Sequence, residues 1–302
     1  MKLALKVDVD TYRGTREGVP RLVEALERHG AGATFLFSLG PDHTGRAIKR
    51  ILRRGFLSKV SRTSVLRHYG IVTLLYGTLL PGPDIGRRCA GILRRVRDAG
   101  FEVGVHSWDH VKWQDGVATA DAAWTERQMR RACDRFAQIF GEPPRVHGAA
   151  GWQMNRHAFC LTGRLGFDYS SDTRGHCPFV PMGDWELDAC PQLPTTLPTL
   201  DELIGREGLT PEDVHEHVLR LCANAPSTGH VFTAHAELEG MRLLPVLERL
   251  LAGWRSLGYE IVPMREIALN LDTKTLPRHH VGAGKVPGRS GSLAVQGDWA
   301  LA

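Results

Sequence analysis

The chain has 302 residues, of which 42% are hydrophobic and 24% are charged, and its formal net charge is +5. This composition is ordinary for a soluble globular protein and is sufficient for one sizeable core. Residues 1–10 alternate apolar and polar side chains, without a long apolar stretch or a small-residue cleavage site. Nothing therefore marks a secretory signal, and we expect a cytoplasmic protein.

Positive charge is concentrated in one segment. Between His43 and Pro83 there are eight Lys or Arg residues and no Asp or Glu, and without these eight charges the rest of the chain carries −3. A local basic surface suits anionic head groups or phosphates better than it suits nucleic acid, so we expect no nucleic-acid partner.

The six cysteines are scattered along the chain, without a CxxC pair or another short metal-ligand spacing. They are Cys89, Cys133, Cys160, Cys177, Cys190 and Cys222. This pattern favours reduced thiols in the core or on the surface, and we assign them no chemistry.

The N-terminal part of the chain predicts β-α-β order. Residues 3–10 have a period of two, which predicts a strand with Asp8 and Asp10 on one face at its C-terminal end. A helix is expected at about Glu17–His29, and an apolar strand is expected at Ala33–Leu39.

Helix and strand signals continue to alternate along the rest of the chain. Asp84 is expected to cap a helix that stops at Gly100, and a short strand at Phe101–Val105 leads into His106. The other expected elements are helices at about 121–140 and 210–222, and strands near 146 and at 167–171, 230–235 and 259–262. The tail from Leu271 has little periodicity and is expected to be loosely ordered.

Repeated strand and helix units favour a parallel sheet, open or closed into a barrel, because βα crossovers bury both of its faces. In either form the functional site lies beyond the C-terminal ends of the strands. Three separate segments place reactive side chains there: Asp8 with Asp10, His106 with His110, and His235.

These five residues predict a hydrolytic metal site. His106 and His110 face the same way on a helical turn and could bind one ion, with Asp10 as the third ligand and open positions for water and substrate. Asp8 is then available as the general base, and His235 as the acid that protonates a departing amine. We expect one divalent ion, with zinc preferred, although cobalt, nickel, manganese or iron would also suit these ligands.

Together these segments resemble the NodB-type polysaccharide deacetylase superfamily. Its members carry a paired-aspartate motif, an H-[ST]-x-x-H motif and a late strand that ends in histidine. Here the motifs read Val-Asp8-Val-Asp10, His106-Ser-Trp-Asp-His110 and Thr-Ala-His235.

Within that superfamily the resemblance is closer to the deformylases of lipid-linked 4-deoxy-4-formamido-L-arabinose, and it covers about residues 3–270. It is carried by the segments DVDTYRGTREGVP from Asp8, AAGW from Ala149, SDTRG from Ser171, LPTLDELIGR from Leu197 and HAE from His235.

The resemblance implies a distorted (β/α) barrel of the polysaccharide deacetylase type over residues 1–270. It also implies hydrolysis of the formamide on an undecaprenyl-phosphate-linked sugar, which yields formate and a free amino sugar for lipid A modification and polymyxin resistance. By the same resemblance Asp8 is the base, Asp10, His106 and His110 hold the metal, and His235 is the acid.

One position departs from the superfamily pattern. Many members have an arginine directed at the base about five residues before the tryptophan of a Gly-Trp pair, whereas this chain has His147 before Trp152. We hypothesise that Arg174 supplies the missing cation and that Asp172 orients Arg174 or His235. Trp152 is a candidate for lining the sugar site.

The basic segment at about 43–83 is expected to be a helical insert that contacts the inner face of the cytoplasmic membrane. Its uncharged part, residues 69–83, is short and contains Gly70 and Gly77. A helix that lies on the surface therefore fits better than one that spans the membrane. The expected partners are a lipid-linked amino sugar and the membrane surface, and no oligomeric state is predicted.

Three other functions remain as alternatives. A deacetylase of chitin-like or peptidoglycan sugars would use the same five residues on an N-acetyl group. A non-haem iron oxygenase would use two histidines and one carboxylate, but it has no necessary role for Asp8 or His235. A nucleic-acid-binding or membrane-binding module would bind through its arginines in a salt-sensitive way, without needing His106 and His110.

Overall fold

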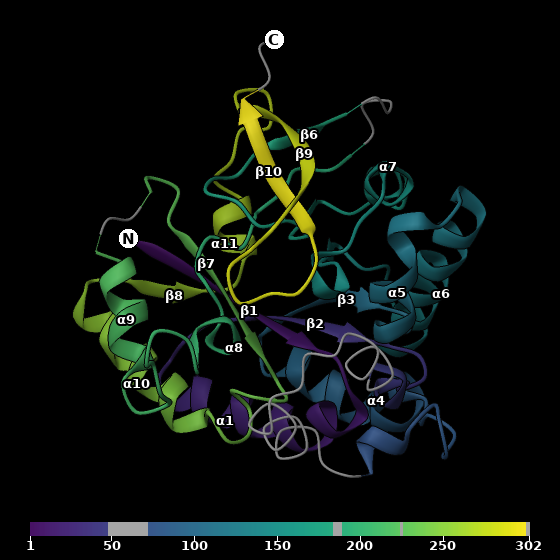
Figure 1. Ribbon diagram of the computed structural model, residues 1–302, viewed down its shortest axis with the longest axis horizontal. Helices are drawn as coiled ribbons and strands as arrows, with labels where there is room; N and C mark the ends of the chain where they lie inside the picture. The colour runs from purple at the N-terminus through teal and green to yellow at the C-terminus, as the bar shows by residue number, and fades with distance from the viewer. Residues whose placement is uncertain (48–71, 184–188, 224–225, 300–302) are drawn as a thin grey trace.

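A parallel β-sheet forms the centre of the protein (Figure 1). The computed structural model describes residues 1–47, 72–183, 189–223 and 226–299. The sheet consists of β1 (Lys2–Val9), β2 (Thr34–Ser38), β3 (Glu102–Ser107), β4 (Val146–His147), β5 (Tyr169–Ser170), β7 (His230–His235) and β8 (Glu260–Val262). Its order is β5-β4-β3-β2-β1-β7, β8 pairs with the start of β1, and these pairs are all parallel. The predicted α/β fold is confirmed.

Strand β1 is buried on both faces, and the two faces differ in chemistry. One face belongs to the main hydrophobic core and consists of Leu3, Leu5, Val7 and Val9. The other face carries Ala4, Lys6 and Asp8, which are also buried. Because successive side chains of a strand point to opposite sides, the period of two separates an apolar outer row from a partly polar row inside the curved sheet.

The curved sheet is completed by a segment that contacts both of its edges. The backbone N–H of Leu193 donates to the Ser170 carbonyl at the β5 edge, and that of Thr196 donates to the Val231 carbonyl in β7 at the other edge. Residues 191–197 thus bridge the gap between the edges, which gives the distorted barrel that the resemblance implies.

Helices cover the outer side of the sheet. The longer ones are α1 (Val19–Arg28), α4 (Ile85–Asp98), α6 (Ala122–Phe140), α7 (Arg156–Arg164), α9 (Val214–Leu221) and α10 (Leu244–Ser256), and the shorter ones are α5 (His110–Gly116), α8 (Leu200–Leu203) and α11 (Arg265–Ala268). Asp84 caps α4 as predicted, because its side chain accepts a hydrogen bond from the Arg87 backbone N–H. The first helix begins later than expected, since a π-helical turn, η1 (Gly14–Gly18), precedes it.

The described part of the chain contains no helix that is both long enough and apolar enough to cross a membrane. The basic segment at 43–83 is described only at its two ends. Of its eight cations, Arg46 is described and the other seven lie within residues 48–71, outside the described ranges. Most of the predicted helical insert therefore lies in residues 48–71, outside the described ranges.

The C-terminal tail differs from the prediction. Strands β9 (Arg278–Gly284) and β10 (Leu293–Trp299) form an antiparallel hairpin, which pairs with β6 (Val180–Met182) in a second sheet at the top of the view in Figure 1. The prediction of a loosely ordered tail is wrong because it relied on low periodicity along the chain. The hairpin is held instead by long-range backbone hydrogen bonds, such as those that join Arg174 to Ala294 and Gln296.

Candidate active site

The ends of three strands meet over one cavity of about 260 Å³. β1 carries Asp8 and leads into Asp10, β3 carries His106 and leads into His110 at the start of α5, and β7 ends in His235. Parallel pairing of β1 with β7 places Asp8 opposite His235. The structure thus brings the five predicted residues to the walls of one cavity.

Asp10, His106 and His110 form a compact set of atoms that could bind a metal ion. Asp10 Oδ1 lies 3.2 Å from His106 Nε2 and 3.4 Å from His110 Nε2. Asp10 Oδ1 is buried and accepts no hydrogen bond from the described residues. Since the three atoms all lie within 4.8 Å of one another, they fit a single ion.

The electrostatics of this set favour an ionised carboxylate. Burial opposes ionisation of Asp10, but His110, and then His106 and His235, lower the pKa of Asp10 well below its usual range. Burial also opposes protonation of His106, whereas Asp8 and Asp10 raise the pKa of His106. An ionised aspartate beside two imidazoles is a donor set that suits a divalent cation, so these residues fit the predicted ion.

Asp8 is buried beside a cation that the sequence analysis missed. Lys6 Nζ lies 3.4 Å from Asp8 Oδ2 and donates a hydrogen bond to the Ser171 carbonyl oxygen. Asp8 Oδ1 accepts no hydrogen bond from the described residues and lies 3.7 Å from His106 Nδ1. Lys6 therefore compensates the charge of Asp8, while one carboxylate oxygen stays available for chemistry.

The hypothesis that Arg174 supplies the cation beside Asp8 is wrong. The Arg174 guanidinium forms an ion pair with Glu202, and the position beside Asp8 belongs to Lys6. The physical reason is that Glu202 and the Leu197 carbonyl oxygen hold the guanidinium of Arg174, while its backbone pairs with Ala294 and Gln296 of β10.

Asp172 also has a different partner from the one predicted. It accepts hydrogen bonds from His147 Nδ1 at 2.7 Å and from the Ala149 backbone N–H at 2.8 Å, instead of orienting Arg174 or His235. Burial opposes its ionisation, but the charge and hydrogen bond of His147 lower the pKa of Asp172. The histidine that departs from the superfamily pattern therefore pairs with this buried carboxylate.

His235 lies near a carboxylate that α8 positions. Asp201 Oδ1 is 4.0 Å from His235 Nδ1 and accepts a hydrogen bond from Thr199 Oγ1 at 2.6 Å. Burial opposes ionisation of Asp201, but Arg289 and His235 lower the pKa of Asp201. Asp201 is therefore held as an anion beside the imidazole.

Arg289 reaches the cavity from the loop between β9 and β10. Its guanidinium lies 3.1 Å from an Asp201 carboxylate oxygen and 2.8 Å from a Glu202 carboxylate oxygen. It also lines the cavity that contains the five predicted residues. The tail that was expected to be loosely ordered thus supplies a charged group to the site.

Trp152 borders the cavity and carries several cations on its ring. The ring is 1% exposed, and its centroid lies 6.4 Å from that of His235 in an edge-to-face arrangement. The cations near the ring are Lys6 at 5.2 Å, Arg174 at 5.0 Å and Arg289 at 4.9 Å from its centroid. The backbone of Trp152 has a φ of 52°, in the turn η4 (Ala150–Trp152), and such left-handed conformations cost about 1–3 kcal/mol and concentrate at functional sites.

Two buried glutamates follow β7. Glu237 accepts hydrogen bonds from the backbone N–H groups of Asp10 and Thr11, at 3.1 and 2.8 Å, so it fixes the turn after β1. Glu239 accepts a hydrogen bond from the His235 backbone N–H at 2.7 Å. Burial raises the pKa of Glu239 to about 7, although His235 opposes this shift.

Several residues around the cavity had no predicted role. These are Lys6, Asp201, Glu202, Glu237, Glu239 and Arg289. Lys6 had a usable signal, because the period of two places it on the same strand face as Asp8. Asp201, Glu202 and Glu237 lie in segments that carry the resemblance, whereas nothing around Arg289 indicated a site.

Comparison with known proteins identifies the family. Residues 3–170 match the polysaccharide deacetylase family. This match includes the paired aspartates of β1 and the His106 to His110 segment. The chain belongs to the polysaccharide deacetylase family, in which catalysis is generally metal-dependent.

Two relatives match nearly the whole chain. A protein of Shewanella sediminis (strain HAW-EB3), named "Probable 4-deoxy-4-formamido-L-arabinose-phosphoundecaprenol deformylase ArnD", is 37% identical over 98% of this chain and 94% of its own length. A protein of the same name from Wigglesworthia glossinidia brevipalpis is 29% identical over 94% of this chain and 98% of its own length. Within the polysaccharide deacetylases, this chain is therefore similar to proteins named as deformylases.

Solved structures share the fold. The "putative polysaccharide deacetylase from Mycobacterium smegmatis" has a TM-score of 0.64 and 19% sequence identity, with 94% of each chain covered. PuuE allantoinase has a TM-score of 0.61 and 15% identity, with 89% of each chain covered. At these identities the similarity concerns the barrel architecture alone.

We expect Lys6→Met to lower kcat for amide hydrolysis by at least about 100-fold, because the buried Asp8 then lacks a compensating charge and no longer serves as a base. Lys2→Met is the matched control, since Lys2 lies on the same strand but pairs with Glu266, away from the cavity. Circular dichroism verifies that both variants are folded. A Lys6→Met enzyme with the wild-type rate would show that Lys6 has no influence on Asp8.

We expect Glu239→Gln to change how stability depends on pH. An unfolded Glu ionises near pH 4.5, whereas Glu239 in the folded protein ionises near 7, so the wild type loses stability as the pH rises through this window. From about pH 5 to pH 8, the unfolding free energy of Glu239→Gln should therefore rise relative to wild type by about 2 kcal/mol. Urea denaturation at several pH values measures this, and parallel pH profiles for the two proteins would contradict it.

Proposed function

We propose that this protein hydrolyses the formamide of undecaprenyl-phosphate-linked 4-deoxy-4-formamido-L-arabinose. The products are formate and the free amino sugar, which then serves lipid A modification and polymyxin resistance. One observation carries the proposal: Asp10, His106 and His110 converge beside Asp8 and His235 in one cavity, within a chain that is 37% identical over nearly its whole length to a protein named as this deformylase.

In the proposed mechanism Asp10, His106 and His110 would hold one divalent ion, preferably zinc. When bound, such an ion would supply Lewis-acid polarisation of the formyl carbonyl and a more acidic water. Asp8 takes a proton from the attacking water while the water oxygen adds to the formyl carbon. The available Asp8 Oδ1 suits this role. His235 then donates a proton to the sugar nitrogen as the carbon–nitrogen bond breaks, which releases formate and the amine.

Asp201 acts as a positioning residue in this proposal. A carboxylate beside an imidazole orients the ring and stabilises its protonated form, and Asp201 lies 4.0 Å from His235 Nδ1. Arg289 holds Asp201 from the other side. Trp152 lines the cavity beside the sugar, and its ring makes a cation–π contact with Arg289.

We further propose that the protein works at the inner face of the cytoplasmic membrane, where a lipid-linked sugar is presented. The described C-terminal end of the basic segment, residues 72–83, exposes Val72, Leu79 and Leu80, which are 56%, 81% and 41% exposed. Leu74, in the same stretch, lines the cavity. Exposed apolar side chains beside a cavity, next to a segment rich in cations, suit contact with an anionic lipid surface.

The substrate assay compares a formamido-arabinose lipid with its acetamido analogue. We expect formate release at least about 10-fold faster than acetate release, because in a site built for a formyl group the additional methyl group of acetyl would cost about 1–3 kcal/mol of transition-state binding. A chelator should abolish both reactions and an added divalent ion should restore them, while exclusion of oxygen changes nothing. His106→Ala should be inactive, and His157→Ala, on α7 outside the cavity, should be active. Equal release of acetate would instead favour an N-acetyl deacetylase.

Co-sedimentation with liposomes tests the membrane proposal. The double variant Leu79→Ser with Leu80→Ser should bind anionic vesicles at least about 10-fold more weakly, because each buried leucine contributes about 1.5–3 kcal/mol. Leu269→Ser is the control. Leu269 is 78% exposed, but it follows α11, outside the basic segment, and does not line the active-site cavity. Equal binding of the wild type and the double variant would refute a role for these leucines.

A further inference from the structure

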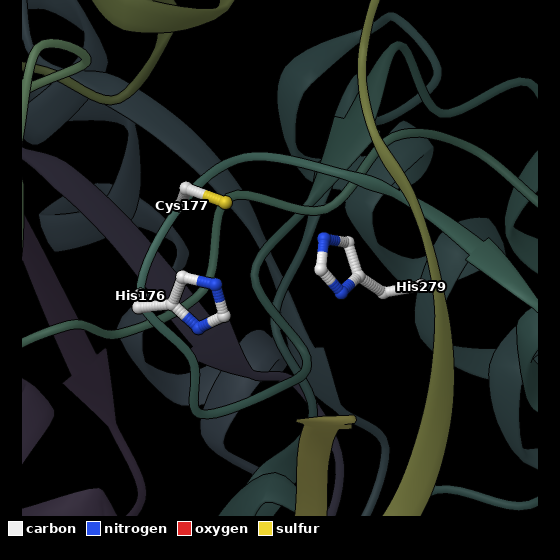
Figure 2. Close-up of side chains that lie close together, drawn as sticks. All are labelled: His176, Cys177 and His279. Carbon is white, nitrogen blue, oxygen red and sulfur yellow. The ribbon is translucent and has the colours of Figure 1, made fainter. Parts of the chain in front are cut away.

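A second set of side chains with metal-binding chemistry lies outside the active-site cavity. It consists of His176 and Cys177, in the loop after β5, and His279 on β9. Their ligand atoms all lie within 4.8 Å of one another. Figure 2 shows the three side chains facing a common space between the loop and the strand. None of the three lines the cavity that holds Asp10, His106 and His110.

A hydrogen bond on one ring nitrogen of His279 orients the other ring nitrogen for metal binding. The ring is buried, and Nδ1 lies 2.9 Å from the Gly297 carbonyl oxygen. A carbonyl oxygen only accepts, so Nδ1 carries the proton and Nε2 of the neutral ring carries the lone pair. Metal-binding histidines almost always have such a hydrogen bond, which fixes the tautomer and the ring orientation.

Gln296, on β10, organises the other two residues. Its side-chain oxygen accepts hydrogen bonds from the backbone N–H groups of His176 at 2.8 Å and Cys177 at 3.3 Å, and its side-chain nitrogen donates to Cys177 Sγ at 3.3 Å. This contact fixes the position of the sulfur atom, and deprotonated sulfur is the form in which a cysteine binds metals. A Cβ at Gly175 would lie only 2.3 Å from the Gln296 oxygen, so glycine at this position permits the close approach.

We propose that His176, Cys177 and His279 bind a second ion, of the zinc type, with water as the fourth ligand. One thiolate and two imidazoles select zinc over magnesium, calcium or manganese. A tetrahedral zinc ion separates such ligand atoms by about 3.3–3.6 Å, so small rotations of the exposed His176 and the half-buried Cys177 would complete the site. The cysteine pattern gave no signal because the third ligand comes about a hundred residues later.

This ion would fasten the C-terminal hairpin to the loop after β5. The loop already pairs with β10 through Arg174, and His279 adds a contact to β9. The loop between these two strands carries Arg289, which holds Asp201 beside His235. The second ion would therefore have a structural role, because it would stabilise the hairpin that carries Arg289 at the cavity wall. This role does not depend on which amide the enzyme hydrolyses.

Titration of the full-length, reduced protein with cobalt(II) tests the site. Bound thiolate gives a near-ultraviolet sulfur-to-cobalt charge-transfer band, which the Asp-His-His set cannot give because it contains no sulfur. We expect the band in wild type, in His106→Ala and in Cys133→Ser, the control cysteine on α6. It should be absent in Cys177→Ser, and His176→Ala should bind cobalt at least about 10-fold more weakly. No band in wild type, or an unchanged band in Cys177→Ser, would overturn the proposal.

Thermal unfolding gives a second readout that is independent of activity. In the His106→Ala background, zinc should raise the melting temperature of the protein, and the additional change Cys177→Ser should remove this increase. Circular dichroism without metal verifies that both proteins fold, which is expected because Cys177 is only partly buried. An equal increase with and without Cys177 would show that the stabilising ion binds elsewhere.

Discussion

A carboxylate buried inside the curved sheet needs a compensating positive charge, and Lys6 provides it to Asp8 at 3.4 Å. Both side chains come from the inner face of β1, whose outer face anchors the main hydrophobic core. Because β1 pairs in register with β7, the same strand that holds the buried pair also sets His235 opposite Asp8. The proposed base, the proposed acid and their electrostatic balance thus depend on one strand and its parallel partner.

Around this centre, charges from distant segments balance one another. α8 presents Asp201 and Glu202, the loop after β5 presents Arg174, and the C-terminal hairpin presents Arg289. Positively and negatively charged side chains alternate in this network, and the ring of Trp152 packs against the cations. Much of this network lies beyond residues 3–170, the part that matches the family. The family region therefore contains the proposed metal ligands, and the second half of the chain contains the proposed acid and the residues that support it.

The hairpin also connects the cavity with the proposed second metal site. Arg289 points to the cavity from between β9 and β10, while His279 and Gln296 on these strands meet His176 and Cys177. A soft, sulfur-containing site and a harder Asp-His-His site in one chain would differ in metal preference. Their separate chemistry allows the structural and the hydrolytic ions to be distinguished by spectroscopy.

The sequence by itself determined the α/β order and the strand ends that carry Asp8, Asp10, His106, His110 and His235, because local periodicity and motif spacing are properties of neighbouring residues. Only the tertiary structure decided that Arg174 turns to Glu202 and that the tail hairpin pairs with the loop after β5, whereas the period of two already placed Lys6 on the same strand face as Asp8. These contacts join residues far apart in the chain, and their partners are selected by strand register and barrel closure. A local pattern contains no information on that selection, which is why Arg289 and the His176, Cys177 and His279 cluster emerged only from the fold.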